Sequence, residues 1–333
     1  MTTVVEERDR SLLTRVQHLL HAQATIGPAV VLLVSVVVFA LLSERFLTPG
    51  NISLILQQVA VVGTLAVGQT IVILTAGIDL SCGAIMVLTS IVMAKVAAET
   101  GLPGFPALLL GFLVGTVCGL LNGMLVTRLK LPPFIVTLGT LNVFFALNLW
   151  YSGSATIRGT DMPSLLLWTG QTFTVGGTRI TYGSIMLVVL VAAMAFVLKN
   201  TAWGRHVYST GDDLEASRLS GIRTARVLLS VYATAGLVYA LAAWTLIGRI
   251  ASASPQAGQT DNLDSITAVV IGGTSLFGGR GAVVGSLIGA LIVGVFRNGL
   301  ALAGVDVLWQ TMAVGVLIIV AVSLDQWIRK VKA

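Results

Sequence analysis

The sequence predicts an all-α, polytopic membrane protein with about ten transmembrane helices and both termini in the cytoplasm. Hydrophobic residues make up 56% of the 333 residues and charged residues only 10%, against roughly 25% charged residues in soluble domains. Mean hydropathy is +0.94, and the apolar residues are grouped in long charge-free runs. These observations exclude an ordinary soluble domain.

The charge-free runs give the order of the predicted helices. A helix crosses the bilayer core with about 20 mostly apolar residues, although shorter segments occur inside bundles. The ten runs are 26–43, 46–78, 80–94, 100–127, 131–157, 180–198, 227–248, 265–279, 281–296 and 307–324. Three of them, 80–94, 265–279 and 281–296, are short for a full crossing. The Thr- and Gly-rich stretch 162–178 is predicted to be an external loop.

Residues 1–25 are predicted to form a cytoplasmic N-terminal segment with an amphipathic stretch around Leu12 to Leu20. The run at 26–43 lacks a small-residue cleavage site and is followed by charged residues, so we expect a retained anchor rather than a cleaved signal peptide. Residues 26–327 then form the membrane domain, and residues 328–333 form a cytoplasmic tail.

The basic residues fall unevenly on the two sides of the membrane. With the N-terminus inside and ten alternating spans, fourteen of the twenty Lys and Arg residues lie on cytoplasmic segments, and six lie at or near the outer ends. This bias satisfies the positive-inside rule. An odd number of spans would place Arg329, Lys330 and Lys332 outside, so ten spans are favoured.

Glycine spacing indicates where helices pack closely. Two runs have glycines every four residues on one face: Gly111, Gly115, Gly119 and Gly123 in the fourth, and Gly281, Gly285 and Gly289 in the ninth. Such faces let helix backbones approach in lipid, and we favour packing within the chain over packing against a second copy. Two similar glycine-bracketed turns, 77–83 and 278–281, suggest an internal duplication of the kind found in transporters.

The polar segment 199–226 contains a short predicted helix. Asp212 is placed to accept a backbone N–H near Glu215 while Glu215 reaches back, as in a capping box, and Gly221 ends the helix. Isolated helices shorter than about 12–15 residues are marginal in water. The segment is therefore either a solvated loop or a docking surface for a cytoplasmic partner.

The motifs of common enzyme and metal sites are missing. Residues 273–278 begin like a phosphate-binding loop, but Gly279 and Arg280 follow where Lys and Ser/Thr would be needed. Cys82 and Cys118 lie in apolar runs and are expected to be packing residues. We expect no catalytic residue, no cofactor, no metal ion and no nucleic-acid partner.

Neutral polar side chains, rather than ionisable ones, occupy the predicted spans. Ion-coupled carriers usually keep ionisable residues at mid-membrane depth, so this pattern favours a path for a neutral polyhydroxylated solute with energy supplied from elsewhere. Each of these side chains could instead form an interhelical hydrogen bond. The candidate path residues are Gln69, Thr75, Asn122, Asn142 and Asn148, and Gln57 and Gln58 are further neutral polar groups.

Several motifs resemble the permease subunits of bacterial ABC importers for ribose, xylose, galactose and related sugars. They are Ala66 to Thr70, Gly77 to Ser81, Leu131 to Thr140, Gly204 to Tyr208, Glu215 to Ile222 and Ala268 to Gly281. The run Gly-Gly-Thr-Ser-Leu-Phe-Gly-Gly-Arg-Gly at 272–281 is the most specific; branched-chain amino-acid permeases share less of it. The resemblance covers roughly Asn51 to Trp327. Residues 1–25 have no counterpart, and Ser217 stands where many members have Ala.

The resemblance implies a non-enzymatic, multi-pass subunit of the cell inner membrane that forms the path for a monosaccharide or polyol. The implied partners are a second permease copy or paralogue, a cytoplasmic ATP-hydrolysing subunit and an extracytoplasmic solute-binding protein. Contact with the ATPase would fall on Asp212, Glu215, Ala216, Arg218, Leu219 and Gly221. The alternatives are a branched-chain amino-acid permease of the same type, and a channel or ion-coupled carrier acting alone.

Overall fold

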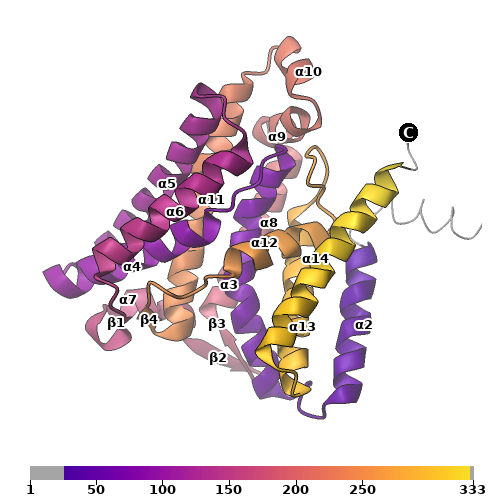
Figure 1. The fold of residues 1–333 in the computed structure, drawn as a ribbon. Coiled ribbons are helices and arrows are strands. Elements are labelled where there is room, and N and C mark those ends of the chain that lie inside the picture. Colours follow the sequence, from indigo (N-terminus) through magenta and orange to yellow (C-terminus); the bar gives the residue numbers. More distant parts are fainter. Residues whose placement is uncertain (1–25, 331–333) are drawn as a thin grey trace, which may run out of the picture.

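The computed structural model describes residues 26–330 of the chain. The predicted cytoplasmic segment 1–25, including the stretch Leu12 to Leu20, and the last residues of the tail lie outside the described residues. The described chain is a helical bundle with two small two-stranded sheets at the end opposite α10 (Figure 1).

Seven helices in this part of the chain are long and apolar enough to cross a membrane. They are α3 (Pro49–Leu74), α4 (Cys82–Thr100), α5 (Gly104–Arg128), α6 (Pro133–Ser152), α8 (Tyr182–Asn200), α11 (Thr224–Ile250) and α13 (Val283–Leu302). Two shorter apolar stretches lie in α2 (Ile26–Leu42) and α14 (Val307–Lys330). This architecture agrees with the predicted all-α polytopic membrane protein.

Two of the three short charge-free runs belong to long helices, and the third does not. Those at 80–94 and 281–296 belong to α4 and α13, which continue past Lys95 and Arg297, the charges that ended the runs. The run at 265–279 contains only α12 (Asp261–Ile271), which has 11 residues. At 1.5 Å per residue α12 is roughly 16 Å long, about half of the ~30 Å hydrocarbon core. It is therefore not a full span.

The predicted loop at 162–178 is an ordered cap. Together with its flanks it forms η1 (Gly159–Asp161), α7 (Ser164–Leu167), η2 (Trp168–Gly170) and the hairpin of β2 (Thr172–Val175) and β3 (Thr178–Thr181), while β1 (Ile157–Arg158) pairs with β4 (Ser252–Ala253). Gly176 and Gly177, with φ of 57° and 83°, form the hairpin turn. Positive φ at both central residues is the geometry of the tight hairpin turns that favour glycine.

The first glycine face packs within the chain, as predicted. A Cβ on Gly115 would lie 2.6 Å from the carbonyl oxygen of Gly236 in α11, and one on Gly119 would overlap the carbonyl oxygen of Tyr232. In the second set, a Cβ on Gly289 would overlap the carbonyl oxygen of Ala268 in α12. Gly281 precedes α13 and has a φ of 143°, so it belongs to the turn.

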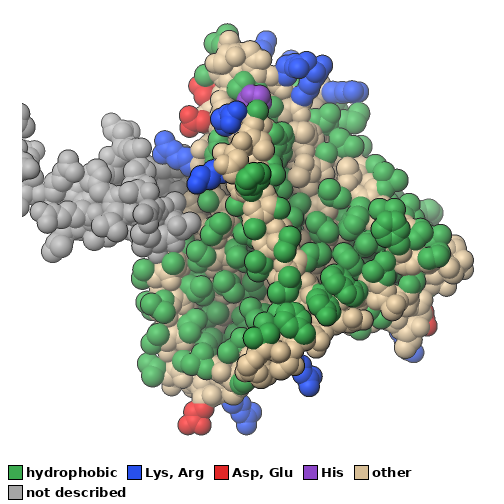
Figure 2. All heavy atoms as spheres, turned by 180° about the vertical axis from the view of Figure 1, so that it is seen from behind, with side chains coloured by type: hydrophobic (Ala, Val, Ile, Leu, Met, Phe, Trp, Pro, Cys, Tyr) green, Lys and Arg blue, Asp and Glu red, His purple; other side chains and the backbone are tan. Residues whose placement is uncertain are grey.

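The outer surface has the pattern of a membrane protein. Hydrophobic side chains cover the middle of the face shown in Figure 2, and charged side chains gather toward its ends. The exposed apolar residues include Leu33 in α2, Leu113 in α5, Phe134 in α6 and Val189 in α8. A bilayer would cover such a belt.

Candidate functional site

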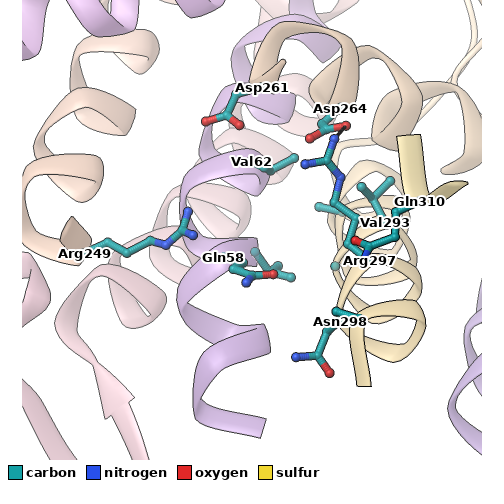
Figure 3. Close-up of a pocket in the computed structure, with 13 residues that line it drawn as sticks. Gln58, Val62, Arg249, Asp261, Asp264, Val293, Arg297, Asn298 and Gln310 are labelled. Atoms are coloured by element: carbon teal, nitrogen blue, oxygen red, sulfur yellow. Dashed lines mark hydrogen bonds and ion pairs between the residues drawn. The ribbon is translucent and has the colours of Figure 1, made fainter. Parts of the chain in front are cut away.

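A cavity of about 280 Å³ lies between α3, α12, α13 and α14, with one side chain contributed by the end of α11 (Figure 3). Its volume is near the lower end of the roughly 300–1,000 Å³ of small-molecule sites. The polar lining consists of Gln58, Arg249, Asp261, Asp264, Arg297, Asn298 and Gln310. The apolar lining consists of Val59, Val62, Ala290, Val293, Gly294 and Ala301.

An ion pair joins two walls of the cavity. Nη2 of Arg297 in α13 lies 2.7 Å from Oδ1 of Asp264 in α12, and the Asp264 side chain is 1% exposed while that of Arg297 is 35% exposed. The second carboxylate oxygen of Asp264 is buried and has no hydrogen-bond partner among the described residues. A buried acceptor left without a donor costs free energy, so this oxygen would be stabilised by any donor that reaches it.

The other polar groups surround the space in front of this pair. In Figure 3, Arg249 points toward the cavity from the side opposite Arg297, with Asp261 above and Gln58 below the two guanidinium groups. Asn298 is fixed by a reciprocal amide pair with Asn51, in which each Nδ2 lies 2.8 Å from the other residue's Oδ1. The cavity thus presents both donors and acceptors beside apolar walls.

The cavity lies far from the polar segment predicted to dock a partner. Gln58 precedes Leu74 by 16 residues in α3, which is about 24 Å along the helix axis. Leu74 is at the end of α3 that meets α9 (Ala202–Asp212). The molecule therefore has two candidate sites in opposite halves.

The predicted cap of the short helix is wrong by one residue. Asp212 ends α9, and the N-cap of α10 (Leu214–Leu219) is Asp213, whose Oδ1 accepts from the backbone N–H of Ala216 at 2.9 Å. Glu215 does not complete a capping box. Its carboxylate instead lies 3.8 Å from Arg218 on the surface. Asp213 provides the cap because its extended backbone directs the side chain back over the first turn.

Apart from Ser217, residues 212–221 of the predicted docking segment are exposed at one end of the molecule (Figure 1). Gly221, with a φ of 85°, follows the end of α10 as predicted. Leu214 is 46% exposed and Leu219 is 87% exposed, so α10 presents two apolar side chains on its surface. Ser217 is buried and fixes α10 to α9, because its Oγ lies 2.8 Å from that of Ser209.

A backbone junction connects this segment to the helices of the cavity. The N–H of Gly279, in the turn between α12 and α13, donates to the carbonyl oxygen of Leu74 at 3.0 Å. A Cβ on Gly211 in α9 would overlap that same carbonyl oxygen. Tyr208 in α9 also donates through its hydroxyl to the carbonyl oxygen of Gly281 at 2.9 Å. The ends of α3, α9 and the turn before α13 are thus in direct contact.

The comparison with known families gives one decisive match. A family model described as branched-chain amino acid transport system / permease component matches residues 51–322, which is most of the chain. The chain belongs to this permease family.

Individual proteins that resemble the chain indicate which kind of permease it is. It is 51% identical over 332 residues to the fructose import permease of Rhizobium meliloti, covering 98% of this chain and 92% of that protein. It is 42% identical over 301 residues to the ribose import permease of Bacillus subtilis, covering 90% and 92%. With the galactose/methyl galactoside import permease of Escherichia coli it shares 34% identity over 313 residues, covering 90% and 93%. The predicted resemblance to permease components of ABC sugar importers, rather than to enzymes, is confirmed.

The five candidate path residues of the permease are distributed over the bundle, and none of them lines the cavity. Gln69 is buried and its Oε1 accepts from the Tyr239 hydroxyl at 3.1 Å. The Thr75 hydroxyl donates to the carbonyl oxygen of Val72 at the end of its own helix. Asn142 is exposed and donates to Leu138, one turn back in α6.

The two remaining asparagines connect separate elements. Asn122 in α5 donates to Oγ of Ser81 at 2.8 Å, and Asn148 in α6 donates to the carbonyl oxygen of Pro255 at 2.9 Å. A role for these five residues in solute contact stays a prediction. Of the neutral polar groups noted in the sequence, Gln58 lines the cavity, whereas Gln57 donates to Ser53 within α3.

Sequence reasoning missed the four charged residues of the cavity. Arg249, Asp264 and Arg297 directly border charge-free runs, since a charge ends each run, and Asp261 lies three residues before Asp264. The helices continue through three of these positions and begin at the fourth. The signal that could have found them is the rule that ionisable residues beside apolar membrane segments mark functional candidates. Within residues 26–330, no cluster of three or more His, Cys, Asp or Glu side chains is placed to hold a metal ion.

Proposed function

We propose that the permease forms the membrane path for a monosaccharide in an ATP-driven importer, with fructose as the first solute to test. The observation that carries the proposal is the 51% identity to a fructose import permease over 98% of the chain. A cavity with donors, acceptors and apolar walls is compatible with such a solute, since sugars present hydroxyl groups and C–H surfaces together.

A cytoplasmic ATP-hydrolysing subunit is the proposed partner of α10. Support comes from the exposed Leu214 and Leu219 and from the junction that links α9 to α3 and to the turn before α13. Contact would involve Asp212, Glu215, Ala216, Arg218, Leu219 and Gly221. Delivery of the sugar by an extracytoplasmic binding protein, and pairing with a second permease copy or paralogue, complete the proposed assembly.

The proposed topology has ten membrane segments in the cell inner membrane. These are the seven long helices, α2 and α14, and α12 as a partial segment. Segment 199–226 and both termini would be cytoplasmic, which agrees with the fourteen-to-six distribution of basic residues.

Reconstitution tests this proposal. The permease is placed in proteoliposomes with its ATPase subunit and binding protein, and uptake of labelled fructose, ribose, galactose and leucine is compared with and without ATP. ATP-dependent uptake of a monosaccharide is expected. Uptake of leucine alone would support the amino-acid alternative, and uptake without the ATPase subunit would support a carrier or channel acting alone.

A further inference from the structure

We infer that the cavity is a transient sugar-binding site within the permease, in which Asp264, oriented by Arg297, accepts hydrogen bonds from hydroxyl groups of the passing solute. This inference rests on the proposed sugar-import function. It assigns the permease a solute contact of its own, separate from recognition by the binding protein.

The position of the charges indicates that the cavity faces water or solute rather than lipid. Arg297 lies within α13, a helix long and apolar enough to span the membrane, and Arg249 lies in the last turn of α11. Charged side chains at such positions almost always face the bundle interior or a water-filled cavity. By contrast, the exposed faces of α5, α6 and α8 carry Leu, Val and Phe.

The charges of the lining are balanced. Two arginines and two aspartates line the same space, so the site has no net charge to attract an anion or a cation. A sugar hydroxyl both donates and accepts, and can therefore bond to a carboxylate and to a guanidinium at once. Val59, Val62 and Val293 provide an apolar wall for the C–H face of a sugar ring.

Asp264 has a buried acceptor that is unused. Its Oδ1 is occupied by Arg297 at 2.7 Å, whereas its buried Oδ2 lacks a hydrogen-bond partner in the described residues. A hydroxyl reaching this oxygen would supply the missing donor. Hydrogen bonds to charged groups are stronger than those between neutral groups, so Asp264 is the expected main contact. Gln58, a neutral amide that lines the same cavity and both donates and accepts, is the expected second contact.

The test replaces the ion pair by apolar residues of similar size. In Asp264→Leu/Arg297→Met no buried charge is left alone, and such replacements are often neutral or stabilising. If the pair only holds α12 to α13, this variant should transport normally. If Asp264 contacts the sugar, the fructose taken up per ATP hydrolysed should fall about tenfold or more. The control is Lys95→Met/Glu99→Leu, which removes an ion pair in α4 outside the cavity, together with the bond from Lys95 to the carbonyl oxygen of Tyr151, and should leave this ratio unchanged.

A labelling measurement keeps the inference testable if the double variant is not recovered from the membrane. Gln58→Cys, on a background without Cys82 and Cys118, is reacted with a hydrophilic thiol reagent in the reconstituted complex. Fructose-loaded binding protein with a non-hydrolysable ATP analogue should slow the reaction, whereas sugar-free binding protein should not. Asp264→Asn should remove most of this protection.

The outcomes distinguish a failure of the proposed sugar-import function from a failure of the inferred sugar contact at Asp264. If the wild-type complex imports no monosaccharide, the proposed function fails. If the wild-type complex imports fructose and Asp264→Leu/Arg297→Met imports it equally well, the sugar-contact inference is overturned. Equal labelling of the Gln58→Cys variant with loaded and sugar-free binding protein would also overturn it.

Discussion

Nη2 of Arg297 lies 2.7 Å from Oδ1 of Asp264, so a single ion pair joins the last long apolar helix to the short helix before it. Both residues also line the cavity. The pair therefore contributes to stability and, by our inference, to solute contact. The two roles can be separated by substitution. Replacing one partner should lower stability, whereas replacing both should restore stability and still remove the solute contact.

Removing one partner of this pair should destabilise the permease strongly. Arg297→Met leaves the carboxylate of Asp264 buried and uncompensated, which should cost about 3 kcal/mol, the low end for a broken buried pair because Arg297 is partly exposed. Adding Asp264→Leu should recover most of this loss. Thermal unfolding in detergent of both single variants and the double variant measures the coupling, and additive losses would contradict it.

The backbone junction at Gly211 should not tolerate a methyl group. In Gly211→Ala the new Cβ would overlap the carbonyl oxygen of Leu74, a backbone atom that cannot move without shifting α3. We expect low recovery of folded protein in membranes and a lowered Tm. Gly139→Ala in α6 is the control, since a Cβ there meets no atom within 4 Å. Equal stability of the two variants would show that the junction is loose.

A substitution at the end of α10 should weaken the coupling between the permease and its ATPase subunit without unfolding the permease. Gly221 has a φ of 85° with open space around it, so Gly221→Val costs about 1–2 kcal/mol of local backbone strain and causes no core clash. We expect near-normal membrane expression, weaker retention of the ATPase subunit and reduced solute-stimulated ATP hydrolysis.

The matched control is Gly304→Val, because Gly304 has a φ of 76° and open space in the connection between α13 and α14. This variant has the same kind of strain outside α10 and should retain the ATPase. Full retention by both variants would refute the assignment of α10 as the docking element.

Topology can be read by single-cysteine labelling. His206 in α9 and Thr160 in η1 are both exposed, and the native Cys82 and Cys118 are buried. On a background lacking the native cysteines, Thr160→Cys should react with an impermeant reagent from the periplasmic side, and His206→Cys should react only after the membrane is opened. The reverse pattern would invert the proposed orientation and remove the docking argument.

Two of the predicted path residues should differ in their effect on stability. Gln69→Leu removes the acceptor of the buried Tyr239 hydroxyl and should cost about 1–3 kcal/mol. Asn142→Leu loses one bond to its own helix at an exposed position and should change stability by less than about 0.5 kcal/mol. Thermal unfolding measures stability, and fructose uptake measured alongside tests the predicted solute contact. A normal uptake rate in folded Asn142→Leu would remove that residue from the path.

Much of the fold follows from local sequence. Charge-free length predicts the long helices, and glycine spacing predicts a close-packing face on α5, whose partner helix, α11, is known only from the structure. Gly221 predicts the end of α10, because only a residue free to adopt positive φ continues the chain there. The cap was misplaced by one residue, since Asp212 and Asp213 are chemically alike and only the backbone direction between α9 and α10 distinguishes them.

The cavity could not be predicted in the same way. Its charged residues come from α11, α12 and α13, and their convergence depends on tertiary packing. A charge is also a reasonable local sign that a span has ended. Arg297 is an exception, because α13 continues past it and Asp264 compensates its charge. The two residues are 33 positions apart in the sequence, so no local pattern reveals the pair.

The shortness of α12 determines when that part of the chain can enter the membrane during synthesis. A segment of 11 residues with Asp261 and Asp264 in its first turn is a poor candidate for insertion by itself, since it is short and a carboxylate at the centre of a membrane helix would cost about 2.5–3.5 kcal/mol on insertion scales. Both the compensating guanidinium and the glycine face that packs on α12 belong to α13, which the ribosome makes afterwards. We therefore expect α12 to enter the hydrocarbon only once α13 has been made, with the two helices inserted together as a hairpin.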